Sequence, residues 1–252
     1  MKKTIVLSIL FVAIGASAAF SQLRDTTINA DINPNRKMEH IEVNFSTDGT
    51  YGYTLKVDNK EYKGELANGE YAYAELIDIN QNDGYTEIAI VDVGPSDGHD
   101  TYIFRFTGEI IPMGRISGMS APEPAGDGTA RAYWWMGFWG FNKHYKIDDA
   151  TNTLVEITQE TYPVKDVEAV VIESFAVRSE RREDVLYSTA LIKAGSKILF
   201  IEADITPVCI NSAGYEDEDE CDWFLIESND GVRGWVQLKD FRDKVEGLIW
   251  AG

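Results

Sequence analysis

The sequence predicts an all-β protein, and three observations support this fold class. Apolar and polar residues alternate with a period of two, most clearly over residues 51–57, and this alternation is typical of half-buried strands. Turn-forming residues such as those at 58–60 and 94–98 separate the strand-like stretches at short intervals. No amphipathic stretch is long enough for a helix of more than about three turns.

The first 39 residues are expected to precede the folded part of the chain. Lys2 and Lys3 come before an apolar run over 5–14 and the small residues of 15–18. This order is typical of a secretory signal peptide, so we assign residues 1–18 to a leader and predict a periplasmic or extracellular protein. Cleavage after Ser21 is an alternative, and a retained anchor is disfavoured by the shortness of the apolar run. The polar residues 19–39 predict a flexible lead-in.

Residues 40–165 are predicted to form an antiparallel β domain that is built from hairpins. Its expected strands begin at residue 41 and continue through 51–57, 62–66, 71–77, 87–93, 102–106, 110–116, 145–147 and 154–157. An acidic loop joins two of these strands, and a loop rich in glycine and proline covers residues 117–130.

The strand pattern restarts after Tyr162-Pro163, which places a domain boundary near residue 165. The expected strands here are short, at 170–172, 175–177, 190–192, 198–201, 223–226 and 234–236. Short strands with closely spaced turns favour a small barrel over residues 166–252.

The overall charge excludes several classes of partner. The chain has 23 basic and 42 acidic residues, a net charge of −19. Nucleic acids and anionic lipids are bound through clustered lysine and arginine, so neither is expected as a partner. No segment after the leader is apolar enough to span a bilayer, and membrane insertion is not expected.

The acidic loop at 78–87 reads Asp-Ile-Asn-Gln-Asn-Asp-Gly-Tyr-Thr-Glu. Oxygen-bearing side chains recur along it, and Gly84 stands where a tight loop must bend. Ca²⁺ takes several oxygen ligands from such a loop, which predicts a structural calcium site with the ligands Asp78, Asn80, Asp83 and Glu87. The alternative is a turn rich in Asn and Asp, residues that favour turns without any metal.

Two cysteines, Cys209 and Cys221, remain for an exported chain. An even count in an oxidising compartment predicts a disulfide between them. Closing this loop would stabilise the fold by about 3 kcal/mol in the chain-entropy description. The alternative is two free thiols.

An aromatic run over residues 133–141 contains Trp134 and Trp135. Flat rings can stack on the apolar faces of sugars or peptides, and two adjacent residues of a strand face opposite sides. We therefore take Trp134 and Trp135 as candidate ligand contacts, together with Trp223 and Trp235 of the C-terminal part. The alternative is that all four rings pack in the core or line a groove wall.

A catalytic function is not expected. A nucleophile needs a positioned base, and no Ser-His or Cys-His signature occurs. His40, His99 and His144 are scattered and do not have the spacing of zinc ligands. The alternative is a secreted hydrolase or inhibitor whose site is assembled from dispersed carboxylates.

The C-terminal part resembles bacterial SH3-like (SH3b) domains. The resemblance is carried by Lys-Ala-Gly-Ser-Lys-Ile at 193–198, by a strand that opens on Trp at 223–226, and by Asp-Gly followed by Gly-Trp-Val at 230–236. It implies a small SH3-like barrel that binds peptides or cell-wall components. The insert at 205–222 departs from the family pattern and puts the usual groove of such domains in doubt.

The acidic loop resembles the Asp-x-Asp-x-Asp-Gly-x-x-Asp calcium loop of FG-GAP/VCBS propeller repeats, with one extra residue between Asn80 and Asp83. This resemblance implies propeller-blade-like hairpins and the same four metal ligands. One such loop is recognised, so a complete propeller is not expected. Taken together, these features predict a secreted, non-catalytic binding or adaptor protein of the cell envelope, whose ligand is a cell-wall peptide, a glycan or a protein.

Overall fold

The computed structural model describes residues 23–46, 50–95, 98–181, 189–207, 209–210, 216–217 and 220–250. The predicted leader 1–18 lies outside the described residues. The all-β prediction is confirmed, because antiparallel sheets dominate the described chain. Its named helices are the short α1 (Leu238–Phe241) and η2 (Arg242–Lys244). Among the described residues, none of the helices has the length and apolar character needed to cross a membrane.

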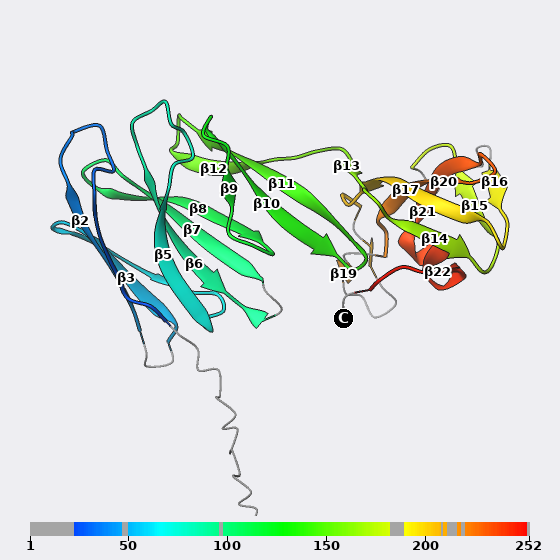
Figure 1. Ribbon diagram of the computed structural model, residues 1–252, viewed down its shortest axis with the longest axis horizontal. Helices are drawn as coiled ribbons and strands as arrows, with labels where there is room; N and C mark the ends of the chain where they lie inside the picture. Colours follow the sequence, from blue (N-terminus) through cyan, green and yellow to red (C-terminus); the bar gives the residue numbers. More distant parts are fainter. Residues whose placement is uncertain are drawn as a thin grey trace, which may run out of the picture.

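Three four-stranded sheets follow one another along the chain, and each is a meander whose strands pair in sequence order. The first sheet contains β1 (Thr26–Ala30), β2 (Glu39–Phe45), β3 (Gly52–Val57) and β4 (Lys60–Glu65). The second contains β5 (Tyr71–Ile77), β6 (Glu87–Val93), β7 (His99–Phe106) and β8 (Ile110–Gly118). The third contains β9 (Glu123–Pro124), β10 (Thr129–Met136), β11 (Trp139–Asp148) and β12 (Thr153–Ile157). Figure 1 shows the three sheets in succession across one lobe of the molecule.

The three sheets are stacked, and a hydrophobic layer fills each of the two spaces between them. Val43 and Leu55 of the first sheet share a buried cluster with Ile90 of the second. Ile103 of the second sheet shares another with Ala132 of the third. The second sheet is therefore covered on both faces, which explains why β6 is buried along almost its whole length and lacks the polar alternation of a one-sided strand.

Strand β1 corrects the prediction of a flexible lead-in over residues 19–39. It pairs antiparallel with β2, from Thr26 opposite Val43 to Ala30 opposite Glu39. Ile28 and Ala30 pack against the cluster between the first two sheets. The alternating Thr-Ile-Asn-Ala sequence is short and polar, and its burial depends on a partner strand that sequence reasoning places only from residue 41.

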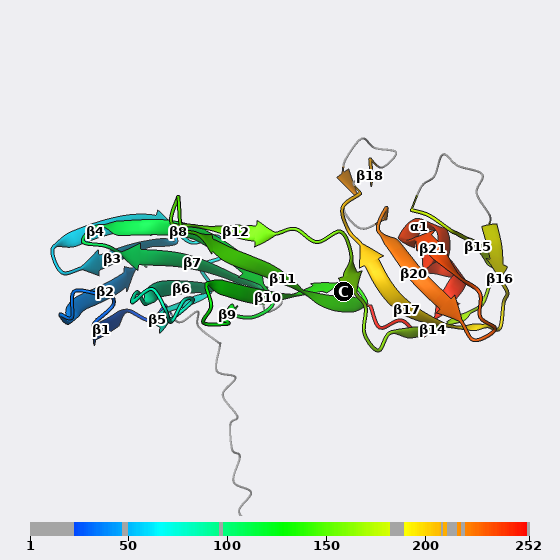
Figure 2. The same cartoon turned by 90° about the horizontal axis from the view of Figure 1, so that it is seen from above.

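The C-terminal sheet has eight strands and curls into a compact lobe (Figure 2). Its main hydrogen-bonded path runs β16-β15-β21-β20-β17-β14-β22, and β13 pairs with β17 beside that path. The strands are β13 (Tyr162–Pro163), β14 (Glu168–Val171), β15 (Phe175–Arg178), β16 (Thr189–Ile192), β17 (Lys197–Asp204), β20 (Trp223–Ser228), β21 (Arg233–Gln237) and β22 (Val245–Glu246). A separate pair is formed by β18 (Cys209–Ile210) and β19 (Glu216–Asp217).

The two lobes share a core at the tip of the β10–β11 hairpin. Phe138 lies within 5.2 Å of Phe200 and 5.3 Å of Phe224 between ring centroids, and Trp139 and Phe141 belong to the same buried cluster. The C-terminal sheet thus begins at Tyr162, close to the predicted boundary at 165, but its hydrophobic core includes residues more than twenty positions earlier in the chain.

Candidate functional site

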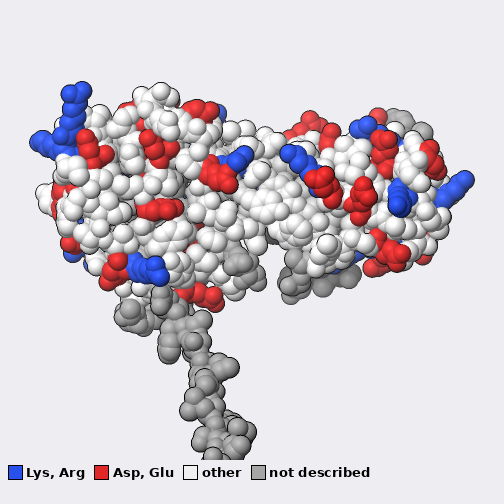
Figure 3. Space-filling model, in the orientation of Figure 1, with Lys and Arg blue, Asp and Glu red and all other residues white. Residues whose placement is uncertain are grey.

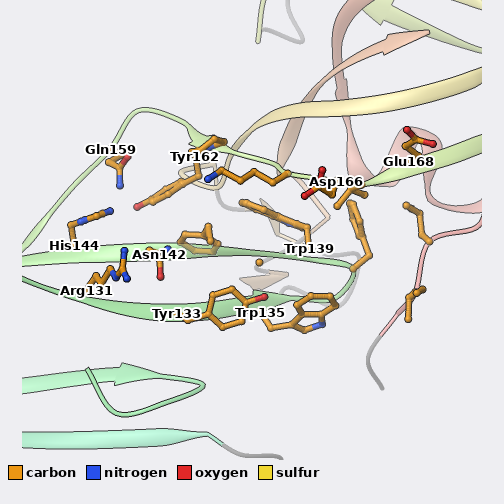
Figure 4. A pocket seen from close by; sticks show the side chains of 18 of the residues that line it. Arg131, Tyr133, Trp135, Trp139, Asn142, His144, Gln159, Tyr162, Asp166 and Glu168 are labelled. Atoms are coloured by element: carbon orange, nitrogen blue, oxygen red, sulfur yellow. The ribbon is translucent and has the colours of Figure 1, made fainter. Parts of the chain in front are cut away.

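A groove of about 650 Å³ lies where the third sheet, the connecting segment between β12 and β14 (residues 158–167) and the C-terminal segment (residues 247–249) meet (Figure 4). Its floor comes from β10 and β11, and the segment that leads into the C-terminal sheet forms one wall. Its lining includes Arg131, Tyr133, Trp135, Asn142, His144, Gln159, Tyr162, Lys165, Asp166 and Glu168.

The floor of the groove is set by the alternation of side chains along β10. Ala130 and Ala132 face the second sheet and are buried. The intervening Arg131, Tyr133 and Trp135 therefore point to the opposite, outer face, where the register places them across from residues of β11 that also line the groove. The outer face of the third sheet is thus the surface on which a ligand can lie.

Two aromatic rings give the floor its apolar character. The side chain of Tyr133 is 39% exposed, and its ring crosses the backbone of Gly140, where an added Cβ would lie 1.9 Å from the Tyr133 hydroxyl oxygen. The Nε1–H of Trp135 donates to the carbonyl of Gly137 at 2.7 Å. Because this polar edge is already bonded, Trp135 offers its apolar face to a ligand.

Polar side chains surround these rings. Figure 4 shows Gln159 and Tyr162 on the connecting segment across from Tyr133, with Asp166 toward the C-terminal sheet. Amides both donate and accept hydrogen bonds, whereas carboxylates only accept them. Such a mixture of flat rings and bidirectional hydrogen-bonding groups suits a ligand that is rich in hydroxyl groups.

One of the four tryptophans predicted as ligand contacts, Trp135, lines the groove. Trp134 points to the inner face, where its Nε1–H donates to the carbonyl of Ser117 on the second sheet at 2.8 Å. Trp223 is 3% exposed and belongs to the interior. Trp235 is half-buried, with the guanidinium of Arg181 at 5.1 Å from its ring centroid. The expectation that adjacent Trp134 and Trp135 face opposite sides agrees with this arrangement.

Several groove residues were missed by sequence reasoning. The signal for Tyr133 was present, because the small Ala130 and Ala132 alternate with large side chains over 129–135. No comparable signal existed for Gln159 and Tyr162. They reach the groove because the chain leaves β12 and crosses to the C-terminal sheet, a path that local pattern does not predict.

The predicted metal ligands are adjacent in the loop, but most of their oxygens already accept hydrogen bonds. Asp83 and Glu87 both accept from Arg105, through Oδ2 at 2.8 Å and Oε1 at 3.0 Å. Glu87 Oε2 accepts from the backbone of Ile79 at 3.1 Å. Within the described residues, no group of three or more metal-ligating acids, histidines or cysteines converges. These residues therefore do not fit a calcium ion that all four predicted ligands would share.

Asp78 is the exception within this loop. Its Oδ1 is buried and receives no hydrogen bond from the residues that the structure describes. Asn80 Oδ1, by contrast, accepts from the backbone of Asn82 at 3.2 Å. One orphaned oxygen does not make a calcium site, because Ca²⁺ requires six or more ligands.

Cys221 is buried, with 9% of its surface exposed. The side chain of Cys209 lies outside the described residues, so the disulfide between these two cysteines stays a prediction. The chain matches no protein-family model, no curated protein and no solved structure.

Proposed function

We propose that this protein is an exported, non-catalytic binding protein that holds a saccharide chain in the groove on the outer face of its third sheet. The leader predicted over residues 1–18 supports export, and the ligand would then be a glycan of the cell envelope. The alternative of a carboxylate-based hydrolase receives less support. Burial raises the pKa of Glu75, as is useful in a catalytic acid, but this residue lies on β5, outside the groove.

The observation that carries the proposal is the pair of rings, Tyr133 and Trp135, on one face of β10. Residues two apart on a strand are separated by about 6.6 Å, a spacing at which two neighbouring sugar rings can each meet one aromatic face. The surrounding amides of Asn142 and Gln159 can donate hydrogen bonds to hydroxyl groups and accept them, and the carboxylate of Asp166 can accept them.

The charge of the groove favours a neutral ligand. Lys165 and Arg131 are balanced by Asp166 and Glu168 among the lining residues. On the face shown in Figure 3, acidic and basic side chains are interspersed over both lobes, and the narrow middle of the molecule is largely uncharged. A polyanion would find no concentrated positive field on this face.

The test measures binding of the full chain to soluble oligosaccharides prepared from bacterial cell wall and to cell-wall peptides, by calorimetry or tryptophan fluorescence. We expect saturable binding to an oligosaccharide. Tyr133→Ala and Trp135→Ala should each weaken it at least about tenfold, because truncating a central aromatic contact typically costs 2 kcal/mol or more.

Tyr51→Ala is the matched control. Tyr51 is 49% exposed but stands directly before β3, outside the groove, so its loss should leave the affinity unchanged. Binding to peptides alone, or equal affinity in all three variants, would contradict a saccharide site in this groove.

Two further predictions belong to the same proposal. The SH3-like character of the C-terminal sheet would make this lobe a second module for peptide or cell-wall ligands.

The disulfide between Cys209 and Cys221 would stabilise the C-terminal lobe in an oxidising compartment. The mass of the purified protein under non-reducing conditions, with and without thiol alkylation, tests that bond.

A further inference from the structure

Glu87 of the loop at 78–87 forms a buried ion pair with Arg105 of β7. The pair lies where the sequence of the loop predicts a metal. Glu87 is fully buried and Arg105 is 4% exposed. A carboxylate in such surroundings requires a compensating charge and hydrogen bonds. Arg105 supplies both, because its Nε donates to Glu87 Oε1 at 3.0 Å and its Nη2 donates to Asp83 Oδ2 at 2.8 Å.

The position of Arg105 is fixed from several sides. Its guanidinium carbon lies 4.7 Å from the ring centroid of Tyr85, a residue of the same loop. Asp83 in turn accepts from the backbone of Tyr85 at 2.9 Å through its second oxygen. Asp83, Tyr85 and Glu87 are thereby held around one cation that belongs to the chain itself.

An equivalent loop in the first sheet uses neutral partners instead. Glu39 is 2% exposed, and its Oε2 accepts from the backbone of Ile32 at 3.1 Å, as Glu87 does from Ile79. Its Oε1 accepts from the side-chain amides of Asn33 and Asn35, both at 3.0 Å. Both loops thus bury one glutamate, and each satisfies it with groups of the protein.

These loops form a continuous edge across the stacked sheets. The backbone N–H of Thr86 donates to the carbonyl of Ile32 at 3.1 Å, and that of Gly128 donates to the carbonyl of Ile79 at 2.8 Å. Loop 78–87 is therefore hydrogen-bonded to a loop of the first sheet and to a loop of the third sheet. A disordered loop 78–87 would lose these hydrogen bonds to both neighbouring sheets.

We propose that the Arg105 guanidinium replaces a divalent cation as the positive charge that holds the carboxylates of Asp83 and Glu87 together in loop 78–87. The stack of sheets consequently keeps its fold without calcium. Arginine suits this role because its planar fork can bond two carboxylates at once and remains charged at every physiological pH.

The first experiment measures the melting temperature of the unmodified protein in millimolar calcium and in chelator. We expect the two values to agree within about 1 °C. A clear rise in calcium that Asp83→Asn abolishes would overturn the proposal, because it would show that an ion binds where the guanidinium lies. This arm remains decisive if the variants below fail to fold.

The second experiment replaces the cation. Arg105→Gln should lower the melting temperature by about 6–20 °C, since breaking a buried pair leaves Glu87 uncompensated. Arg115→Gln, which removes an exposed arginine of β8, should change it by less than about 2 °C. Combining Arg105→Gln with Glu87→Gln should cost less than the sum of the two single changes. Additive losses, or no loss in Arg105→Gln, would overturn the role given to Arg105.

Discussion

The two ends of the stack of sheets carry different outer faces. On the first sheet, the outward side chains of β2 to β4 are polar, and they pair with one another: His40 with Glu42, and Lys56 and Lys63 with Glu61. On the third sheet, the outward side chains include Tyr133 and Trp135, together with Val155 and Ile157, two apolar residues of β12 that are 40% and 37% exposed.

The difference indicates what each end does. A terminal unit of a stacked array needs a polar outer face to remain soluble, and the first sheet has one. The third sheet is covered over part of its outer face by the connecting segment and the C-terminal segment. Between these covers its rings stay accessible, and an accessible aromatic face in a monomer usually has a partner.

The largest expected effect comes from the hairpin tip that joins the third sheet to the C-terminal lobe. Phe138→Ala should lower the free energy of unfolding by about 3–5 kcal/mol, the usual cost of truncating a buried aromatic residue. Amide hydrogen exchange should show protection lost in β17 and β20 and kept in β2 and β3. Tyr133→Ala on the same hairpin should cost less than about 1 kcal/mol. Equal losses of unfolding free energy in the two variants would contradict the prediction that the hairpin tip contributes to the core and the outer face does not.

The next effect compares an inner face with an outer one. Ile103 is fully buried between the second and third sheets, and Ile103→Ala should destabilise by about 2–4 kcal/mol in urea unfolding. His40→Ala, on the outer face of the first sheet, should stay within about 0.5 kcal/mol. A large loss of unfolding free energy in His40→Ala would mean that the polar outer face of the first sheet contributes to folding and not only to solubility.

The hairpins and their turns were predictable from sequence because alternation with a period of two survives wherever a sheet has one buried face. Strand β1 was not predicted, because its Thr-Thr-Ile-Asn-Ala sequence has few apolar residues and is ordered by pairing with β2. The loop at 31–39 was overlooked because Asn35 and Arg36 stand where the acidic loop has Asp83 and Gly84. Asn35 Oδ1 accepts from the backbone of Lys37 as Asp83 Oδ1 does from Tyr85, and Arg36 and Gly84 both have positive φ, so the two loops share geometry without sharing charge.

The candidate groove was less predictable than the fold. The aromatic run indicated that a ring would be exposed, but sequence alone does not say which of Trp134 and Trp135 faces outward. That choice depends on the second sheet, which covers Trp134 and accepts its N–H. The acidic residues of loop 78–87 were found from sequence, whereas their partner Arg105 lies 18 positions after Glu87 and is brought there by strand pairing.

A smaller effect on stability is expected from Tyr145 on the inner face of the third sheet, and it depends on pH. Burial, with a contribution from Glu156, raises the pKa of Tyr145 from 10.0 to about 12. The native state therefore holds this proton more tightly than the unfolded chain, and stability should fall as the pH rises from 10 to 12. At pH 11 this amounts to about 1 kcal/mol. Tyr145→Phe should remove that part of the alkaline loss in urea unfolding, and an equal loss at pH 11 with and without the hydroxyl would contradict it.

The variants with the smallest expected effect on stability compare ligand binding at the two ends of the stack. Each end has an exposed ion pair: Arg131 with Glu123 on the third sheet and Lys56 with Glu61 on the first, all four side chains being 43–64% exposed. Exposed pairs contribute little, so Arg131→Ala and Lys56→Ala should each change the free energy of unfolding by less than about 0.5 kcal/mol. Only Arg131 lines the groove, so only its loss should weaken oligosaccharide binding, by about threefold to tenfold. Because both variants lose an exposed pair and are expected to change stability little, a difference in affinity between them would report the face on which the pair lies, and equal affinities would place the ligand elsewhere.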